Sequence, residues 1–432
     1  MQKIDMIATT ALAKLVQAGT DKAQCVACMS EKREFNVEGG EFSLFRTLFN
    51  TDMTLVAYKD NKKGTVKINS FSDEEIDRGV KEAMQVAESS AADEAYDIAP
   101  RQDEKNFKDG IGEPDLDKFF KRVTELVDTI KKEYPKINIA QLIAAYNNKF
   151  YCYRDTNGTN ITANNGTYSI SVGMTAVDGE KVTSANYFGF TTTDLETPFI
   201  EQGGARKRME KTISILDAKP LDHKFTGTMV MADEALGEFM YFLIDNYIES
   251  EVIKDKTSQW YGKLNEKVAD EKLTVKLSVN DPRIVSKDRF TSDGYVAEDV
   301  TLIDKGVIKQ YFIDTYTANK SGFPVCKNDS YNMIIEPGNT SYDDMIKDIK
   351  EGIIVGMFSG GYPNVDGEFS GVAKNSFYIK DGKIAGPVSE AMINGNLGDI
   401  FNNIRAVSKE VGTDGSAVVP AMAFDGVVVS GK

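Results

Sequence analysis

The sequence is poor in the residues that most often carry catalysis or metal binding. It has one histidine, His223, and four cysteines among 432 residues. A zinc site of the His₃, His₂Glu or H-E-x-x-H kind needs at least two histidines, so one chain cannot form it alone. A serine or cysteine nucleophile would need His223 as its base, and no G-x-S-x-G motif accompanies it. We therefore expect His223 to be a surface or connection histidine.

The cysteines Cys25, Cys28, Cys152 and Cys326 are too few and too scattered for a disulfide framework. Cys25 and Cys28 form a single C-x-x-C, with no second pair to complete a structural zinc site. They fall in a strand-like run, where residues three apart point to opposite faces. We interpret them as buried, reduced thiols, as expected of a cytoplasmic protein.

Long apolar runs and an excess of positive charge are also absent. No apolar run approaches the roughly 20 residues that span a bilayer, and the first 20 residues have the apolar spacing of a helix, not of a signal peptide. The chain has 51 Lys+Arg against 66 Asp+Glu, a net charge of −15. Its most basic segment, ARKRMEK from Ala205, predicts the solvated face of one helix. We expect no direct nucleic-acid binding and no membrane partner.

What is present is an alternation of helical and strand-like segments. Helical apolar spacing covers residues 1–20, 71–89, 116–134 and 198–218, and strand-like runs separated by turn signals lie between them. Residues 41–49 and 53–60 are predicted as two strands with a turn at NTD. After Leu273 the sequence becomes rich in strand-like runs. These patterns predict an α+β fold.

The order of these segments predicts two domains. Residues 1–220 are expected to form an N-terminal antiparallel sheet with flanking helices, and 221–432 a β-rich domain of barrel or sandwich type. Residues 90–114 are acidic, carry proline and glycine and show no periodicity, so we interpret them as a linker within the first domain.

The helix predicted at 231–246, MADEALGEFMYFLIDN, invites comparison with metallopeptidase helices because D-E-A-L-G-E looks like H-E-A-x-G-H with carboxylates for histidines. An apolar stripe begins at Leu236. Asp233 follows a strand-like run directly, so we predict that it is the N-cap, with Glu234 favourable in the first turn. Asp233 and Glu238 lie about 140° apart around a regular helix, so they do not converge on one ion.

An alternative metal site uses carboxylates only. Asp233, Glu234, Glu238 and Asp414 could hold a hard cation such as Mg²⁺ or Mn²⁺ if the helix were broken at Gly237. Such a site would suit a stand-alone hydrolase.

The C-terminal half resembles the TldD/PmbA family, historically called modulators of DNA gyrase and classed with metallopeptidases. The resemblance is carried by 258–275 (SQWYGKLNEKVADEKLTV), by 290–322, and most densely by 352–407, with G-E-F-S-G and D-G-K-I-A-G-P-V-S-E. These phrases are more similar to the PmbA (TldE) branch than to the TldD branch. The N-terminal half agrees only in the order of its elements and in GTVKINSFSDEEI.

The resemblance implies a division of labour. In the family, the TldD-type subunit holds zinc through H-E-x-x-x-H and a C-terminal cysteine, whereas the PmbA-type subunit lacks these ligands and pairs with it. Matching the family's glycine to Gly237 places the histidine positions at Tyr241 and Asn246, the glutamate at Phe242 and the cysteine near Asp414. The resemblance thus implies no metal or other cofactor in this chain and zinc in a TldD-like partner.

Three functional hypotheses follow. The leading one is a metal-free PmbA/TldE-like subunit of a cytoplasmic TldD-type zinc metallopeptidase that trims unfolded peptides, as a heterodimer with a TldD-like chain or as a homodimer. The second is the hydrolase with a carboxylate-bound divalent metal. The third is a non-enzymatic regulator of DNA gyrase or of another protein.

Overall fold

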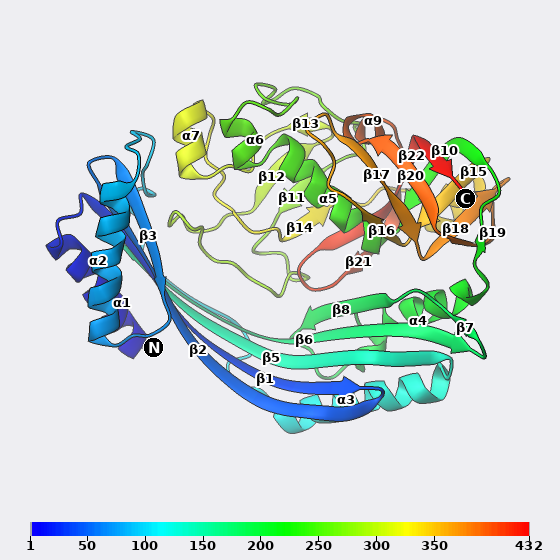
Figure 1. Ribbon diagram of the computed structural model, residues 1–432, viewed down its shortest axis with the longest axis horizontal. Coiled ribbons are helices and arrows are strands. Elements are labelled where there is room, and N and C mark those ends of the chain that lie inside the picture. The colour runs from blue at the N-terminus through cyan, green and yellow to red at the C-terminus, as the bar shows by residue number, and fades with distance from the viewer. Residues whose placement is uncertain (1, 432) are drawn as a thin grey trace.

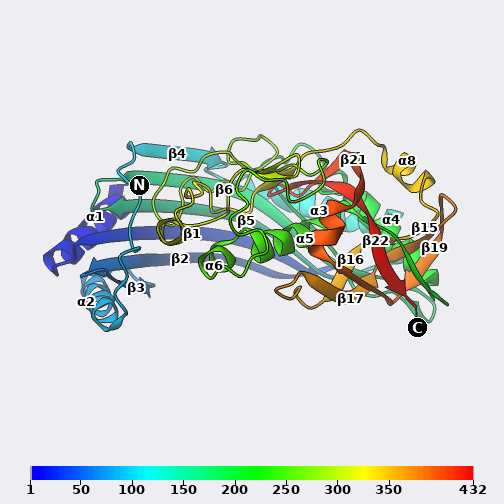
Figure 2. The same ribbon diagram turned by 90° about the horizontal axis from the view of Figure 1, so that it is seen from above.

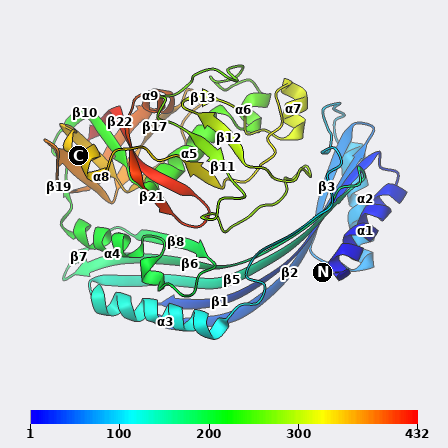
Figure 3. The ribbon, with the colours of Figure 1, turned by 180° about the vertical axis from the view of Figure 1, so that it is seen from behind.

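The fold consists of two large β-sheets and the helices that cover them, as a computed structural model of residues 2–431 shows (Figure 1). Helices make up 24% and strands 43% of the residues, so the predicted α+β class is confirmed. The first sheet curls into an arc, and the second, mixed sheet lies on the concave side of that arc (Figures 1 and 3).

The N-terminal sheet has eight strands, in the order β3-β2-β1-β5-β6-β4, with β7 and β8 also paired to β6. All pairs are antiparallel except that of β4 with β6. Four strands are long enough to run the length of the arc: β1 (Lys22–Glu38), β2 (Glu41–Lys59), β5 (Ile137–Asp155) and β6 (Asn160–Asp178). The shorter strands are β3 (Lys62–Ile68), β4 (Lys105–Gly110), β7 (Lys181–Val182) and β8 (Asn186–Thr192). Figure 2 shows the long strands lying side by side.

Two separate hydrophobic cores lie on the convex side of the arc, each formed by side chains of these same strands (Figures 1 and 3). At one end, α1 (Gln2–Gln17) and α2 (Asp73–Ser89) cover small side chains such as Cys25, Ala27 and Cys152. At the other end, α3 (Leu116–Glu133) covers larger ones such as Tyr146 and Tyr168. Ala205 and Met209 of α4 (Ala205–Ser214) belong to the same core, but α4 lies on the side of the sheet that faces the C-terminal half (Figures 1 and 3). The amphipathic period of these helices accounts for the faces that they bury.

Three details differ from the predictions. β2 is one continuous strand, because the NTD residues at 50–52 stay paired with β1 instead of turning. Residues 90–114 are a connection, but they contain β4. The helix predicted at 198–218 is interrupted: a short 3₁₀ turn η1 (Phe199–Glu201) precedes α4, and η2 (Ile215–Asp217) follows it. Gly203 and Gly204 have φ of 57° and 68°, and this left-handed conformation separates η1 from α4.

The C-terminal sheet has fourteen strands. Its central path is β13-β12-β11-β14-β22-β10-β15-β18-β19-β9, and β20 and β21 pair with β22, β17 with β20 and β16 with β17. The pairs β10–β15 and β14–β22 are parallel, which makes the sheet mixed. The strands are β9 (Lys219–Pro220), β10 (Lys224–Met231), β11 (Val275–Leu277), β12 (Val300–Asp304), β13 (Val307–Ile308), β14 (Met333–Ile335), β15 (Glu351–Val355), β16 (Met357–Gly360), β17 (Glu368–Lys374), β18 (Ser376–Lys380), β19 (Lys383–Ser389), β20 (Ala391–Asn396), β21 (Ile404–Thr413) and β22 (Val418–Ser430).

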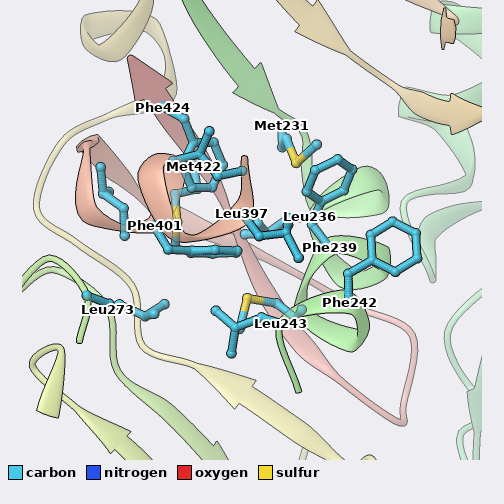
Figure 4. Packing of buried hydrophobic residues seen from close by; sticks show 14 of the residues in the cluster. Met231, Leu236, Phe239, Phe242, Leu243, Leu273, Leu397, Phe401, Met422 and Phe424 are labelled. Atoms are coloured by element: carbon cyan, nitrogen blue, oxygen red, sulfur yellow. The ribbon is translucent and has the colours of Figure 1, made fainter. Parts of the chain in front are cut away.

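The main core of this half forms around α5 (Asp233–Tyr247). Its apolar stripe includes Leu236, Phe239 and Leu243. Leu236 lies beside Leu397 of α9 (Leu397–Asn402), as Figure 4 shows, and the Phe239 ring packs against Phe358 and Phe369 with ring centroids 5.1 Å apart in each case. The remaining helices are α6 (Ser250–Lys254), α7 (Thr315–Ser321) and α8 (Tyr342–Lys347). Among residues 2–431, no helix is both long and apolar enough to cross a bilayer.

Candidate functional site

A cavity of about 610 Å³ lies between the two sheets and contains the start of α5. The N-terminal half supplies one wall, from β6, β8 and the start of α4, and the C-terminal half supplies the other, from α5, β14, β21 and β22. The lining residues are Ser171, Tyr187, Phe188, Gly189, Gly203, Gly204, Arg208, Asp233, Glu234, Gly237, Glu238, Tyr241, Met333, Gly412, Thr413, Asp414, Ala417 and Val419. The volume is in the range of small-molecule and peptide sites.

The helix α5 begins differently from the prediction. Its N-cap is Ala232, which makes no side-chain cap hydrogen bond, and Asp233 is the first helical residue. The predicted Asp233 cap is therefore wrong. The Asp233 carboxylate turns instead toward α4, where Lys207 Nζ donates to it at 3.1 Å. The side chain of Asp233 also fills the space beside Gly412, where an added Cβ would lie 2.2 Å from its Oδ2.

Glu234 holds the two halves of the molecule together at the cavity wall. Its Oε1 accepts from Lys211 Nζ at 2.6 Å and lies 2.9 Å from Arg208 Nη1. All three side chains are largely buried, with 9%, 12% and 15% of their areas exposed for Glu234, Lys211 and Arg208. The segment from Ala205 was predicted to be a solvated face, but this holds only in part: Lys207 and Glu210 are exposed, whereas Arg208 and Lys211 turn inward to Glu234.

The neighbouring carboxylates Asp233 and Glu234 have opposite pKa shifts. Burial and then the hydrogen bond with Glu234 raise the pKa of Asp233, and the exposed Lys207 offsets only part of this. Burial disfavours the charged form of Glu234 as well, but Lys211, Asp233 and Arg208 together hold its pKa well below the ordinary value. Within the pair, Asp233 is therefore the group that takes up a proton first and Glu234 the one that keeps its charge.

All four residues of the carboxylate-only alternative line this cavity. However, across residues 2–431, no three His, Cys, Asp or Glu side chains are grouped closely enough to hold a metal ion. Glu234 is already neutralised by two cations, and burial raises the pKa of Glu238. The helix is also unbroken at Gly237, so the break that would bring Asp233 and Glu238 together does not occur.

One feature of the cavity was not predicted, namely the free backbone of β8. The N–H of Thr191 donates to the carbonyl of Asp414 at 2.6 Å, so it points away from β6. Because alternate residues of an antiparallel strand point the same way, the N–H and C=O of Gly189 also face the cavity. In the run NYFGF, Phe188 and Phe190 are core residues, whereas Tyr187 is 59% exposed. In the sequence, only the alternation of residues within that run could have indicated which of these side chains face the core and which face the cavity.

His223 and the cysteines lie outside this site. His223 Nδ1 is 2.7 Å from Asp222 Oδ1 and Nε2 is 2.8 Å from Glu351 Oε1. Hydrogen bonds to Asp222 and then to Glu351 raise its pKa. The cysteines are buried free thiols, and burial raises the pKa of Cys28 and of Cys152 to about 11. The predictions of a surface histidine and buried thiols are confirmed.

The C-terminal half matches a known family model. Residues 225–431 match the PmbA/TldA metallopeptidase C-terminal domain. The C-terminal half of the chain therefore belongs to the TldD/PmbA family.

Individual members agree with this assignment. A metalloprotease of Methanothermobacter thermautotrophicus is 31% identical over 233 residues, which is half of each chain. The metalloprotease PmbA of Escherichia coli O157:H7 is 24% identical over 403 residues, covering 88% of this chain and 87% of the relative.

Two crystal structures share the fold. TldE from Thermococcus kodakarensis superposes with a TM-score of 0.82 at 18% identity, covering 98% of this chain and all of the other. A protein from Bacteroides thetaiotaomicron, described as a candidate modulator of DNA gyrase, gives a TM-score of 0.86 at 24% identity with both chains fully covered.

The positions matched to the TldD/PmbA metal motif have distinct surroundings. Tyr241 lines the cavity and packs against Tyr331, with ring centroids 5.0 Å apart. Phe242 is buried among aromatic rings that include Phe239 (Figure 4). Asn246 points elsewhere, and its Nδ2 donates to the carbonyl of Asn364 at 2.7 Å.

Asp414 also lines the cavity, but its Oδ1 accepts from Ser416 N and Oγ at 2.8 Å and from Ala417 N at 2.9 Å. This carboxylate therefore shapes its own loop. The set does not fit zinc, because Phe242 has no donor atom, Asn246 Nδ2 donates to a backbone carbonyl and Asp414 Oδ1 is held by Ser416 and Ala417 of its own loop.

Proposed function

We propose that this chain is a metal-free, PmbA/TldE-like subunit of a cytoplasmic TldD-type zinc metallopeptidase complex. Its role is to contribute a wall of the chamber in which unfolded peptides bind, while a TldD-like partner supplies the zinc and the hydrolytic chemistry. The observation that carries the proposal is the donor set on α5 and at Asp414, which is unsuited to zinc in a chain of this family.

The cavity supports a peptide-binding role. Gly189 offers a strand-like donor and acceptor, and Gly237 on the opposite wall leaves open space, since a Cβ there would meet nothing within 4 Å. An extended peptide recognises such an edge through its own backbone, with little dependence on sequence. The aromatic ring of Tyr187 and the carboxyl of Glu238 flank this edge within the same cavity.

Metal content and activity of the purified chain test the proposal. We expect elemental analysis to find no stoichiometric zinc and a peptidase assay with an unstructured peptide to show no turnover by the chain alone. Addition of a TldD-like chain bearing H-E-x-x-x-H should give hydrolysis and co-elution. Stoichiometric zinc together with peptidase activity in the isolated chain would refute the proposal.

The two alternatives have their own discriminating measurements. A hydrolase using Asp233, Glu234, Glu238 and Asp414 should be stabilised by Mg²⁺ or Mn²⁺ in a thermal-shift titration. A regulator of DNA gyrase should capture a topoisomerase, and no peptidase subunit, from its native cell extract. The division into domains at about residue 220 stays a prediction, which limited proteolysis near 214–224 would test.

A further inference from the structure

The cavity between the two sheets contains a carboxyl group without a partner, that of Glu238 on α5. Within residues 2–431, this partly buried carboxyl takes part in no hydrogen bond and no ion pair. Burial raises its pKa, and no cation of those residues acts in the opposite direction. Because burial disfavours the charged form, such a carboxyl ordinarily has a counter-charge or a donor beside it. A molecule that enters the cavity can supply that partner.

The other charges of the cavity wall favour a cation over an anion. Among the described residues that line the cavity, Arg208 is the only basic one, and Glu234 already neutralises it at 2.9 Å. Asp414 accepts hydrogen bonds from its own loop, and no cation of residues 2–431 forms an ion pair with it. A positively charged ligand group would therefore meet Glu238 and Asp414 without a competing cation, whereas a carboxylate would meet like charges.

Two accessible tyrosine rings add to this preference. Tyr187 of β8 and Tyr241 of α5 line the same cavity, with 59% and 40% of their areas exposed. Burial and then the negative charges of Asp414 and Asp245 raise the pKa of Tyr241, so the potential around this ring is negative. The face of a tyrosine ring attracts ammonium and guanidinium groups. Both walls of the cavity thus offer groups that bind a cation.

The free edge of β8 indicates how a peptide would carry a cation into the cavity. Alternate side chains of an extended peptide held at Gly189 project to opposite faces of the sheet. One of these sets lies on the concave face of the arc, on the side where α5 forms the opposite wall of the cavity (Figure 1). Lysine and arginine are long enough to place their charged ends away from the backbone while their stems contact apolar and aromatic surface.

We propose that Glu238 is a specificity-determining residue that selects a lysine or arginine side chain in an extended peptide bound along β8. The Glu238 carboxylate accepts hydrogen bonds from the ammonium or guanidinium group, and the rings of Tyr187 and Tyr241 line the space around it. The inference rests on the proposed function for the presence of a peptide in the cavity. It adds a side-chain preference to contacts with the peptide backbone, which depend little on sequence.

Fluorescence anisotropy with the purified full chain and short unstructured peptides tests this preference. The peptides are acetylated and amidated, and they differ only at one central residue, which is lysine, glutamine or glutamate. We expect the lysine peptide to bind at least about fivefold more tightly than the glutamine peptide, because it gains a charge-assisted hydrogen bond. The glutamate peptide should bind no better than the glutamine peptide. A further peptide with a free N-terminus and no lysine distinguishes a terminal ammonium from a side-chain ammonium.

Two variants with the same change in net charge separate a direct contact from a general effect of charge. Glu238→Gln should reduce the preference for lysine over glutamine to less than about twofold and leave the affinity for the glutamine peptide unchanged. Glu210→Gln changes an exposed residue of α4 that is not among those lining the cavity, and it should retain the preference. Tyr187→Leu should weaken binding of the lysine peptide by about two- to fivefold, because the cation–π attraction is lost while apolar surface remains.

The thermal midpoint of the same variants separates a binding role from a structural one. Glu238→Gln should not lower the midpoint, because the native carboxyl has no partner to lose and burial disfavours its charge. A lower midpoint together with an unchanged lysine preference would assign Glu238 a structural role and would overturn the inference.

Three binding results would also overturn it: a lysine preference below about twofold in the native chain, a preference that Glu238→Gln leaves intact, or a gain in affinity from the free N-terminus and none from lysine. In each of these cases peptides still bind, so the proposed function would stand. If no peptide binds at all, the peptide-binding role fails together with the preference. Zinc content and activity of the isolated chain bear on the proposed function alone, so the two failures are distinguishable.

Discussion

At the scale of single residues, Asp233 and Glu234 show how the surroundings of a carboxyl group determine its pKa. Adjacent in sequence and both largely buried, they have pKa shifts of opposite sign because Glu234 faces two buried cations and Asp233 faces Glu234 and one exposed lysine. The sequence indicated a carboxylate pair at a helix start, but not its partners, because Arg208 and Lys211 lie on a helix more than twenty positions earlier.

Replacement of Glu234 tests this pairing. Glu234→Gln should lower the free energy of unfolding at pH 7 by about 2–4 kcal/mol, because it leaves Arg208 and Lys211 buried without a counter-charge. The difference from the native chain should shrink as pH falls below the ordinary pKa of 4.5, since a carboxyl with a lowered pKa stabilises the fold fully above its ordinary pKa and loses this contribution as pH falls toward the lowered one. Urea unfolding at several pH values measures it. Glu201→Gln, which removes an exposed partner of Arg206, is the control and should change little.

At the scale of elements, α5 has the apolar face that its period predicts. The position of its N-cap and the surroundings of Gly237, however, could be determined only from the structure. Gly237 lies in an unbroken helix and opens onto the cavity. The interruption at Gly203 and Gly204 was hidden because helical spacing continues on both sides of it. The long strand β2 was predicted as two because NTD is a common turn sequence, and pairing with β1 outweighs that local preference.

Two glycines in helices should respond oppositely to the same change. Gly237→Ala should raise the free energy of unfolding by about 0.5–1 kcal/mol, because the helix gains propensity and the new methyl meets nothing. Gly79→Ala in α2 is the matched comparison. Its Cβ would lie 2.9 Å from Ile68 Cγ2 and from Leu55 Cδ1, so it should lower stability by about 1 kcal/mol. Equal responses in urea unfolding would show that the space beside Gly237 is not open.

At the scale of the whole molecule, the C-terminal half contacts the arc at both ends. Near the cavity, α4 and β8 hold it through Glu234 and Asp414. At the far end, Tyr316 stacks on Tyr96 with ring centroids 4.7 Å apart, and its hydroxyl donates to Asp93 at 2.9 Å. The sequence could predict the class of each half from periodicity. It could not predict the cavity, because its walls come from residues as far apart as 171 and 419.

Hydrogen exchange measures the far-end contact. Tyr316→Ala should lower protection of residues 93–99 and 315–321 by about tenfold or more, because a ring stack and a hydrogen bond are both lost. Protection of α5 should not change, since the cavity end keeps its own contacts. Val182→Ala, at a valine that is 62% exposed on β7, is the control and should alter neither region. A loss of protection that spreads to α5 would show that the two ends open together.

The long strands carry a consequence for the accuracy of folding. β1, β2 and β5 contribute inward-facing side chains to both convex cores, one under α1 and α2 and the other under α3. Since side chains alternate with a period of two, a slip of one residue between neighbouring strands would turn the buried sets of both cores outward at once. A mispaired state would therefore lose the packing of both cores, and the packing of each core favours the same strand register as the packing of the other.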